Sequence, residues 1–479
     1  MTRHLMWFRA DLRTIDNTAL AMACQHPDTP VIALYFISTA QWQAHDVAGC
    51  KIDFELRTLQ QLSDELARLN ISLQILYSAD FKQQLIDLKN FCQAQNITAV
   101  FYNKQYEINE LQRDQQLQPL LAGMTVHAFD DQCLVAPQHI KTGEGRFYSV
   151  YTPFKKAWLQ HINQQGVSIL GKPTPRSSLV LAPSPVPIQV LGFASHLTDD
   201  IAQKYWPAGE QAALARLDIF CQQHIRGYKD NRDFPFHAEG TSRLSPYLAI
   251  GAISSRQCYQ AAINEQQAYG ASNGIDHWIS ELGWREFYKH IMVGFERVCK
   301  HQPFKLETNA IVWQHDEENF ARWCAGKTGF PLVDAAMRQL HTIGWMHNRL
   351  RMVTAMFLTK DLGIDWRWGE RYFMQHLIDG DLAANNGGWQ WCASTGNDAA
   401  PYFRIFNPTL QSLKFDANGD FIRHYLPELA HLDNKTIHEP HGKQRQLFLD
   451  YPMPMVDHKA AAKRSIEVFE SIKASASQT

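Results

Sequence analysis

Short continuous apolar runs alternate with amphipathic stretches over the first 130 positions or so. The runs predict five strands, at Leu5–Phe8, Val31–Ile37, Leu73–Tyr77, Ala99–Tyr102 and Val126–Phe129. Apolar residues at helical spacing over Asp53–Leu69 and Phe81–Gln95 predict helices between them. Strands that alternate with helices in this way form parallel sheets. Since no G-x-G-x-x-G follows the first run, an ordinary dinucleotide-binding half is not expected.

The pattern changes after residue 132. Gly171–Ser178 and Pro183–Pro187 are rich in Pro and Ser, which predicts a long, extended connector. Helical spacing then dominates over Ala208–His224, Ser254–Gln267, Asp276–Phe295, Pro331–Ile343 and Met346–Leu362. We therefore expect an α/β Rossmann-like parallel-sheet domain at 1–132, a connector at 133–206 and a helical domain at 207–479.

Composition places the chain among globular proteins large enough for two or three domains. Hydrophobic residues make up 45% and charged residues 20% of its 479 positions. The formal net charge of −2 gives no general attraction to nucleic acid. A DNA-binding surface would have to be a local basic patch, for which the candidates are Arg349, Arg351, Arg404, Lys414 and Arg423.

Cysteine and histidine usage indicates neither a disulfide framework nor a metal site. The nine cysteines contain no C-x-x-C pair, and the 21 histidines form no H-E-x-x-H. No apolar run reaches membrane-spanning length, and Arg9, Asp11 and Arg13 interrupt any signal-peptide core. We expect a cytoplasmic protein with reduced thiols, no metal and no membrane contact.

The richest chemistry lies in Asp379–Trp391, which contains carboxylates, amides, a Gly pair and two tryptophans. Glycine lets a ligand approach the backbone closely. These groups suit a large, planar ligand rich in heteroatoms. Composition alone leaves open the alternative of a Gly-rich surface loop.

This stretch resembles the flavin-binding core of the DNA photolyase/cryptochrome family. Gly344–Met352, Trp278–Tyr288 and the opening His4–Arg13 extend the resemblance, which runs to about Pro408. It is strongest to bacterial class I cyclobutane pyrimidine dimer photolyases with a folate antenna. The resemblance implies a helical FAD-binding domain and light-driven repair of pyrimidine dimers in DNA, a carbon–carbon lyase reaction. It also implies a monomer that is associated with the nucleoid through DNA.

The resemblance implies a set of FAD-binding residues. These are Tyr228, Thr241, Ser242, Arg243, Leu244, Ser245, Arg285, Asn348, Arg351, Asp379, Asp381 and Asn385. The run from Thr241 to Ser245 offers hydroxyls and N–H groups before a helix, as a diphosphate requires, although a helix cap is the ordinary alternative. Asp379 and Arg351 are expected to pair beside the flavin. The neutral amide of Asn385, near the flavin N5, fits an anionic reduced flavin.

A second set is implied to surround the dimer and, with Asn385, to form the catalytic group: Glu281, Trp284, Asn348, Met352 and Trp391. Trp284 and Trp391 would stack on the splayed bases. Glu281 has a simpler alternative as an i,i+4 partner of Arg285. Related (6-4) photolyases carry two histidines at the positions of Asn348 and Met352, and their absence points away from (6-4) repair.

Three further groups complete the implied sites. A phosphate clamp comprises Arg232, Arg285, Arg349 and Arg404. An electron-transfer chain comprises Trp389, Trp366 and Trp313, for each of which core packing is the alternative. A methenyltetrahydrofolate antenna site comprises His45, Asn109, Glu110, Cys299 and Lys300.

Two other functions were weighed. A cryptochrome-type blue-light photoreceptor is the main alternative, but only a short tail follows Tyr451, and Asn385 favours repair. An ordinary flavin oxidoreductase would need a nicotinamide site, for which no fingerprint is present.

Overall fold

The computed structural model describes residues 3–176, 181–442 and 450–476. The chain forms two compact units. Unit 1 comprises residues 1–226, 242–296 and 378–381, and unit 2 comprises 227–241, 297–377 and 382–479. These units divide the chain differently from the expected domains 1–132, 133–206 and 207–479, which stay predictions.

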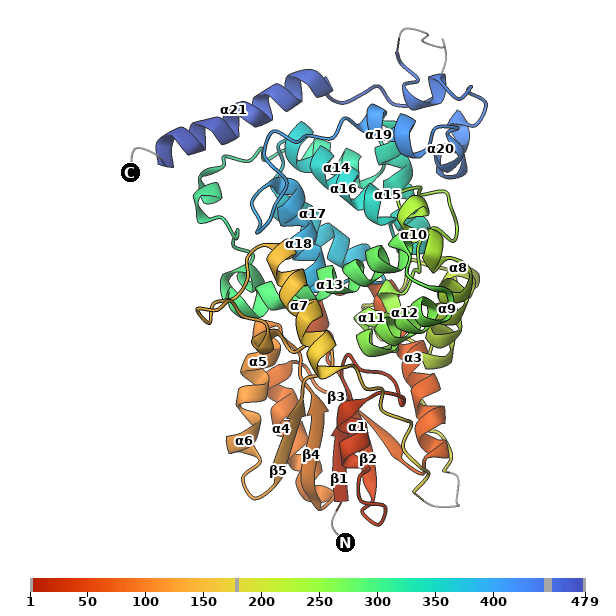
Figure 1. Cartoon of the computed structure of the whole chain (residues 1–479), viewed down its shortest axis with the longest axis vertical. Coiled ribbons are helices and arrows are strands. Elements are labelled where there is room, and N and C mark those ends of the chain that lie inside the picture. Colours follow the sequence, from red (N-terminus) through yellow and green to blue (C-terminus); the bar gives the residue numbers. More distant parts are fainter. Residues whose placement is uncertain (1–2, 177–180, 443–449, 477–479) are drawn as a thin grey trace. The chain divides into compact units, whose positions relative to one another are not determined.

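Unit 1 contains the expected parallel sheet (Figure 1). Its strands are β1 (Arg3–Trp7), β2 (Val31–Ile37), β3 (Ser72–Tyr77), β4 (Ile97–Asn103) and β5 (Thr125–Phe129). All pairs are parallel, in the order β3-β2-β1-β4-β5. The predicted strands are thus confirmed, with ends that differ by two residues at most.

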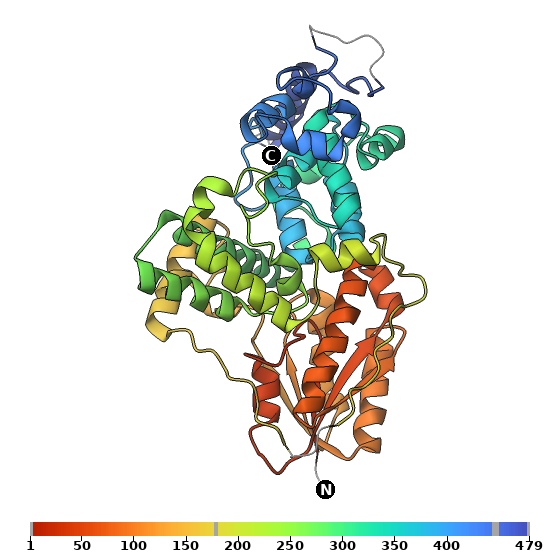
Figure 2. The same cartoon turned by 90° about the vertical axis from the view of Figure 1, so that its right-hand side faces the viewer.

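Side chains alternate across this sheet, so both faces are apolar and both are covered by helices (Figure 2). Met6 and Phe8 pack with α1 (Thr18–Ala23) and α3 (Gly49–Arg68) on one face. Leu5 and Trp7 pack with α4 (Phe81–Ala94) and α6 (Leu117–Leu120) on the other. α5 (Ile108–Gln115) follows β4.

The remainder of unit 1 is helical. It contains α7 (Tyr151–Gln165), α8 (Asp199–Tyr205), α9 (Glu210–Gln223), α11 (Ser245–Ala249), α12 (Ser255–Tyr269) and α13 (Asn273–Gly294). The expectation of an extended connector is wrong over α7, because Phe154, Trp158 and Ile162 recur at helical spacing and are buried. The Pro/Ser-rich stretch Gly171–Ser178 lies partly outside the described residues.

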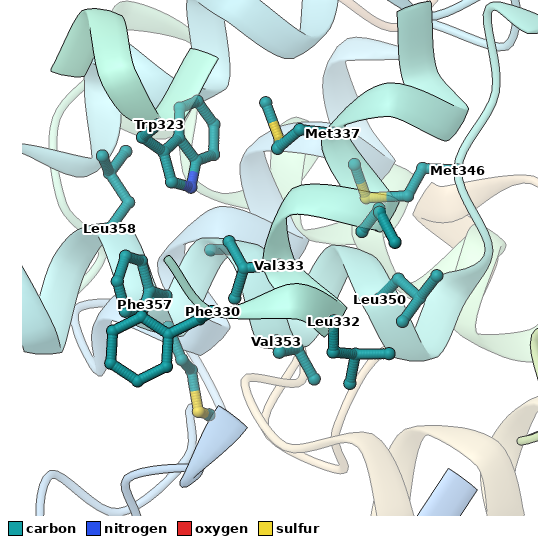
Figure 3. Close-up of a cluster of buried hydrophobic side chains, with 14 of the residues drawn as sticks. Trp323, Phe330, Leu332, Val333, Met337, Met346, Leu350, Val353, Phe357 and Leu358 are labelled. Carbon is teal, nitrogen blue, oxygen red and sulfur yellow. The ribbon is translucent and has the colours of Figure 1, made fainter. Parts of the chain in front are cut away.

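Unit 2 is built from helices around one apolar core, in which Trp323, Met337 and Phe357 lie close together (Figure 3). Its longer elements are α14 (Glu317–Cys324), α15 (Pro331–Ile343), α16 (Asn348–Met356), a π-helix (Phe357–Asp361), α17 (Trp366–His376), α18 (Leu382–Ala393), α19 (Pro408–Phe415), α20 (Asp420–Tyr425) and α21 (His458–Ala476). The parallel-sheet unit and the helical unit confirm the α/β plus all-α fold class. None of the helices in the described ranges combines the length and apolar character needed to cross a bilayer.

A buried ion network ties the sheet of unit 1 to its helices. Asp131 pairs with Arg13 after β1 and, at 2.7 Å, with Arg256 of α12. Arg256 also reaches Asp16 at 2.9 Å. Burial opposes ionisation of Asp131, but the two arginines outweigh it and lower its pKa to about 2.

Asp131→Asn should destabilise the protein by about 3–5 kcal/mol, because it removes the carboxylate that pairs with the buried Arg13 and leaves Arg256 with Asp16 alone. Denaturant unfolding measures the loss. Glu144→Gln, which breaks an exposed pair with Arg146, is the control and should change stability by less than about 0.5 kcal/mol. The Asp131 contribution is present above the unfolded pKa of about 4 and is lost as the pH falls through about 2. Equal stability of the two variants at neutral pH would contradict this role.

Candidate functional site

One face of α13 carries several of the predicted lesion-binding residues in unit 1. Glu281, Trp284, Arg285 and Tyr288 recur at helical spacing and are half-buried, whereas the residues between them are buried. The Trp284 ring stacks on Tyr151 of α7, with centroids 3.6 Å apart and an interplanar angle of 13°. This stacking fixes the orientation of the indole.

Arg285 is engaged within unit 1. Its Nη1 donates to the Gln132 carbonyl at 2.7 Å and to the Ser255 hydroxyl at 3.1 Å, and Nη2 donates to the Leu248 carbonyl at 3.3 Å. Arg285 therefore joins α13 to the beginning of α12 and the end of α11. Its roles toward FAD and DNA phosphate stay predictions.

The predicted diphosphate segment leads into α11. Arg243 has φ of 51°, a left-handed conformation that is uncommon for a side-chain-bearing residue and clusters at functional sites. Arg216 Nε donates to the Ser242 carbonyl at 2.6 Å, Leu244 is buried, and α11 begins at Ser245. Thr241 and Tyr228 belong to unit 2.

The Asp379–Asp381 turn is held by two lysines that sequence reasoning missed. Lys289 of α13 reaches Asp381 at 3.0 Å and Glu107 at 3.4 Å, and Lys51 Nζ donates to the Gly380 carbonyl at 2.6 Å. Burial alone would lower the pKa of Lys289, but Asp381 and Glu107 outweigh it and raise the pKa. The only available signal was the position of Lys289 four residues after Arg285 on the same helix.

In unit 2, Asn385 is oriented by α17. Its Nδ2 donates to the Glu370 carbonyl at 2.8 Å, so Oδ1 is the amide atom left to accept. The Glu370 carboxylate accepts from Asn386 Nδ2 at 2.8 Å and contacts His301 at 2.9 Å. Gln390 Nε2 in turn donates to Asn386 Oδ1 at 2.9 Å. Glu370, Asn386 and Gln390 hold α18 in place, and sequence reasoning identified none of them.

The face of α18 that carries Asn385 leaves room for a planar group. Gly388 lies three residues further along the same face, and a Cβ at that position would meet nothing within 4 Å. At Gly369 of α17, by contrast, there is no room for a side chain, since a Cβ there would lie 2.0 Å from the Trp389 ring. An oriented amide beside open space fits the requirements of a flavin ring.

The three predicted electron-transfer residues share the core of unit 2. Trp389 and Trp366 are buried within it, and the half-buried Trp313 packs against it. Met352 and Trp391, predicted to contact the lesion, also pack against this core while remaining half-buried. Asn348 is exposed at the start of α16.

The structure brings two of the clamp arginines together. Asp233 Oδ1 lies 2.8 Å from Arg349 Nη2 and 3.9 Å from Arg232 Nε. Arg404 is exposed, and Arg351 Nε donates to the Met346 carbonyl at 2.8 Å. Asp233 is a further residue that the sequence did not identify.

A pocket with about 790 Å³ of empty space, part of it open to solvent, lies in unit 1 at the carboxyl ends of β1 and β2. The strand order reverses beside β1, where open α/β sheets bind ligands. His45 and Glu110 line it, and His45 lies 3.0 Å from Asn109 and 3.6 Å from Glu110. Cys299 and Lys300, also predicted for the antenna, are in unit 2, buried and exposed respectively.

Several buried polar atoms in this pocket have no hydrogen-bond partner within the described residues. Glu110 Oε2, Gln84 Oε1 and Arg9 Nη2 make no hydrogen bond. Burial, and next Glu107, raise the pKa of Glu110 to about 7. Because buried polar groups are normally paired, these atoms suit a ligand that has both donors and acceptors.

Two family models match separate parts of the chain. A family model described as the FAD binding domain of DNA photolyase matches residues 278–471, and one described as DNA photolyase matches residues 4–177. The chain is 47% identical over 476 residues to the deoxyribodipyrimidine photo-lyase of Salmonella typhimurium and 46% to that of Escherichia coli, with 99% of each chain covered.

Two solved structures are similar along almost the whole chain. One is a class III photolyase from Agrobacterium tumefaciens, with a TM-score of 0.87 and 34% identity, covering 99% of this chain and 98% of that one. The other is a cryptochrome from Synechocystis, with a TM-score of 0.84 and 29% identity, covering 98% and 99%.

The chain combines a parallel sheet that has a pocket at its strand ends with helices that match an FAD-binding domain. This combination defines a flavoprotein of the kind that uses light. The chain belongs to the DNA photolyase family.

The contrast between Gly369 and Gly388 gives a paired prediction. Gly369→Ala should destabilise the protein by about 1–3 kcal/mol, because the added methyl group overlaps Trp389. Gly388→Ala, which meets open space in a helix, should stabilise the FAD-free protein by about 0.5–1 kcal/mol. Unfolding free energies of both variants test this. A fall in FAD affinity in Gly388→Ala would agree with a flavin beside α18, and equal stability changes would contradict the packing described.

Proposed function

We propose that the chain is a photolyase that repairs cyclobutane pyrimidine dimers in DNA with FAD and light. The observation that carries the proposal is the near full-length similarity to deoxyribodipyrimidine photo-lyases, together with an oriented Asn385 beside open space on α18. When bound, FAD supplies the photoexcited electron that opens the cyclobutane ring. The protein's own residues bind, orient and exclude water.

The residues assigned to the lesion bind it in different ways. Trp284, fixed against Tyr151, and Trp391, supported by the core of unit 2, present aromatic faces for stacking. Met352 fills an apolar gap, while Glu281 and Asn348 contact base edges. A damaged base pair is easier to flip out of the helix, which contributes to selectivity.

The DNA backbone is held by arginines. We assign Arg232, Arg349 and Arg404 to phosphate oxygens, because a guanidinium pairs with two oxygens at once. Asp233 holds Arg232 and Arg349 near each other, at a spacing set by the protein rather than by the ligand. Trp389, Trp366 and Trp313 are assigned to light-driven reduction of the flavin.

Methenyltetrahydrofolate is the proposed antenna. The support is the joint placement of His45, Asn109 and Glu110 beside a pocket with unpaired polar atoms. A solved archaeal photolyase from Sulfolobus tokodaii, with a TM-score of 0.76 and 26% identity, is described as holding two FAD molecules. The second FAD is described as implying a novel light-harvesting cofactor in that protein, and the choice of folate for this chain rests on its own residues. A cytoplasmic, monomeric protein associated with the nucleoid also stays a prediction.

Repair should require light and reduced FAD, and should act on cyclobutane dimers but not on (6-4) photoproducts. Oligonucleotides that carry each lesion, incubated with the protein in light and in darkness, test this. Repair in darkness, or preference for the (6-4) lesion, would contradict the proposal. Light-driven flavin reduction with no repair of either lesion would favour a cryptochrome-type photoreceptor.

Glu110→Gln should weaken folate binding and slow repair under limiting light, while repair by direct flavin excitation is retained. In the wild type, affinity should rise with pH through about 7, as the Glu110 carboxylate ionises and becomes a full acceptor. The variant should lack this pH dependence. Glu55→Gln is the control, since Glu55 lines the same pocket but accepts from Tyr35 at 2.6 Å. Binding titrations followed by folate absorbance measure both, and an unchanged pH profile in Glu110→Gln would contradict the assignment.

A further inference from the structure

A second line of aromatic rings leaves Trp389 within unit 2. The ring centroids of Trp389 and Trp323 are 6.1 Å apart, and those of Trp323 and Tyr372 are 5.6 Å apart. Both pairs are edge-on, at 71° and 64°. The three rings come from α18, α14 and α17, so the line is made by tertiary packing and not by local sequence.

Tyr372 ends this line with a proton acceptor in place. Its hydroxyl lies 2.6 Å from His341 Nε2 and 3.3 Å from the Cys324 carbonyl. In the Nδ1-protonated tautomer of His341, Nε2 accepts the phenolic proton, and in the Nε2-protonated tautomer the phenol donates to the Cys324 carbonyl instead. The His376 ring stacks on Tyr372 with centroids 4.0 Å apart. Tyr372, His341 and His376 are all half-exposed, so both a proton and a small reductant have access from solvent.

The surroundings of the rings favour electron transfer to Trp389 along the line from Tyr372 through Trp323. Trp323 is fully buried, and its Nε1 donates to the Thr354 carbonyl at 3.2 Å, which stabilises a positive charge on the indole. Trp366, on the expected chain, begins α17 and has the Arg367 guanidinium 4.8 Å from its ring. The N-terminus of α17 disfavours a positive charge on Trp366, whereas the charge of Arg367 is balanced by the Asp365 carboxylate at 3.1 Å.

We propose that Tyr372 is a proton-coupled electron donor to Trp389 through Trp323, with His341 as its base. The proposal rests on the proposed function, in which Trp389 is oxidised by the photoexcited flavin. Trp389 takes one electron from Trp323, and Trp323 takes one from Tyr372. The phenolic proton passes to His341 Nε2, which leaves a neutral tyrosyl radical; FAD, when bound, would be the final acceptor of the electron. A thiol in solution then donates a hydrogen atom to the tyrosyl radical, two of the resulting thiyl radicals combine to a disulfide, and His341 releases its proton to solvent.

The base is essential to this step. Burial raises the pKa of Tyr372, so the phenol is neutral before oxidation. An oxidised phenol must lose its proton, and a base within 2.6–3.2 Å accepts it efficiently. The alternative, that the Tyr372–His341 bond only fastens α17 to α15, predicts no radical on Tyr372.

Electron paramagnetic resonance on the FAD-loaded protein decides between them. The protein is prepared with ring-deuterated tyrosine, illuminated with its flavin oxidised, and frozen. If the radical is on Tyr372, ring deuteration should narrow the hyperfine splitting of its spectrum. The tyrosyl signal should be absent in Tyr372→Phe and in Trp323→Phe. Tyr425→Phe is the matched control, because Tyr425 is a half-buried tyrosine of unit 2 whose hydroxyl accepts from Gln339; its signal should match the wild type.

His341→Gln separates proton transfer from packing. The amide can still accept the hydrogen bond but is not a base, so the tyrosyl yield should fall by about 100-fold with the fold retained. Transient absorption in D₂O should also show slower decay of the tryptophan radical in the wild type. A signal that ignores tyrosine deuteration, or that persists in Tyr372→Phe, would overturn the proposal. If the wild type shows no light-driven flavin reduction at all, the result contradicts the assignment of Trp389 to that reduction instead.

Discussion

The buried ion network around Asp131 is the constraint on which unit 1 depends. The segment that follows β1 must leave the sheet and also carry polar groups to the pocket, which buries many charges at once. Asp11 accepts from the Arg9 backbone N–H and from Asn103 Nδ2, each at 2.7 Å, while Arg13, Asp16 and Asp131 neutralise one another with Arg256 of α12. Because buried charges are tolerated only when paired, this arrangement has few alternatives. It thereby fixes the strand ends that form the pocket and the position of α12, to whose first turn Arg285 of α13 is hydrogen-bonded.

A second polar centre plays the same part in unit 2. The Glu370 carboxylate accepts a hydrogen bond from Asn386, and the Glu370 backbone carbonyl accepts one from Asn385. These two bonds fix the position of α18 along its axis and its rotation relative to α17. Tight contact of Gly369 with Trp389 completes the fit. Hydrogen bonds and packing within unit 2 thus hold the face of α18 that carries Asn385, as the cofactor-binding role proposed for Asn385 requires. The chemistry belongs to FAD, and the contribution of the chain is position, polarity and exclusion of water.

Strands and long helices were predictable because their signal is local. Val31–Ile37 and Pro331–Ile343 match the structure residue for residue, since a continuous apolar run and a Pro-initiated helical period leave little choice. The family motifs indicated the site residues by resemblance. Lys289 with Asp381, Asp233 with Arg349 and Trp323 with Trp389 could not be found in this way, because each pair lies far apart in sequence and meets only through packing. The helix α7 was missed because the Pro/Ser-rich stretches that follow it concealed the spacing of Phe154, Trp158 and Ile162.

The central claim is that the protein positions the lesion while light absorbed by FAD drives the bond breaking. The most direct test is the action spectrum of dimer repair, measured as repairs per incident photon at each wavelength, on protein that carries reduced FAD and no antenna. If FAD drives the reaction, the spectrum should follow the absorption of the reduced flavin, and the FAD-free protein should repair no dimers. Repair by the FAD-free protein, or repair at wavelengths where the flavin does not absorb, would contradict it.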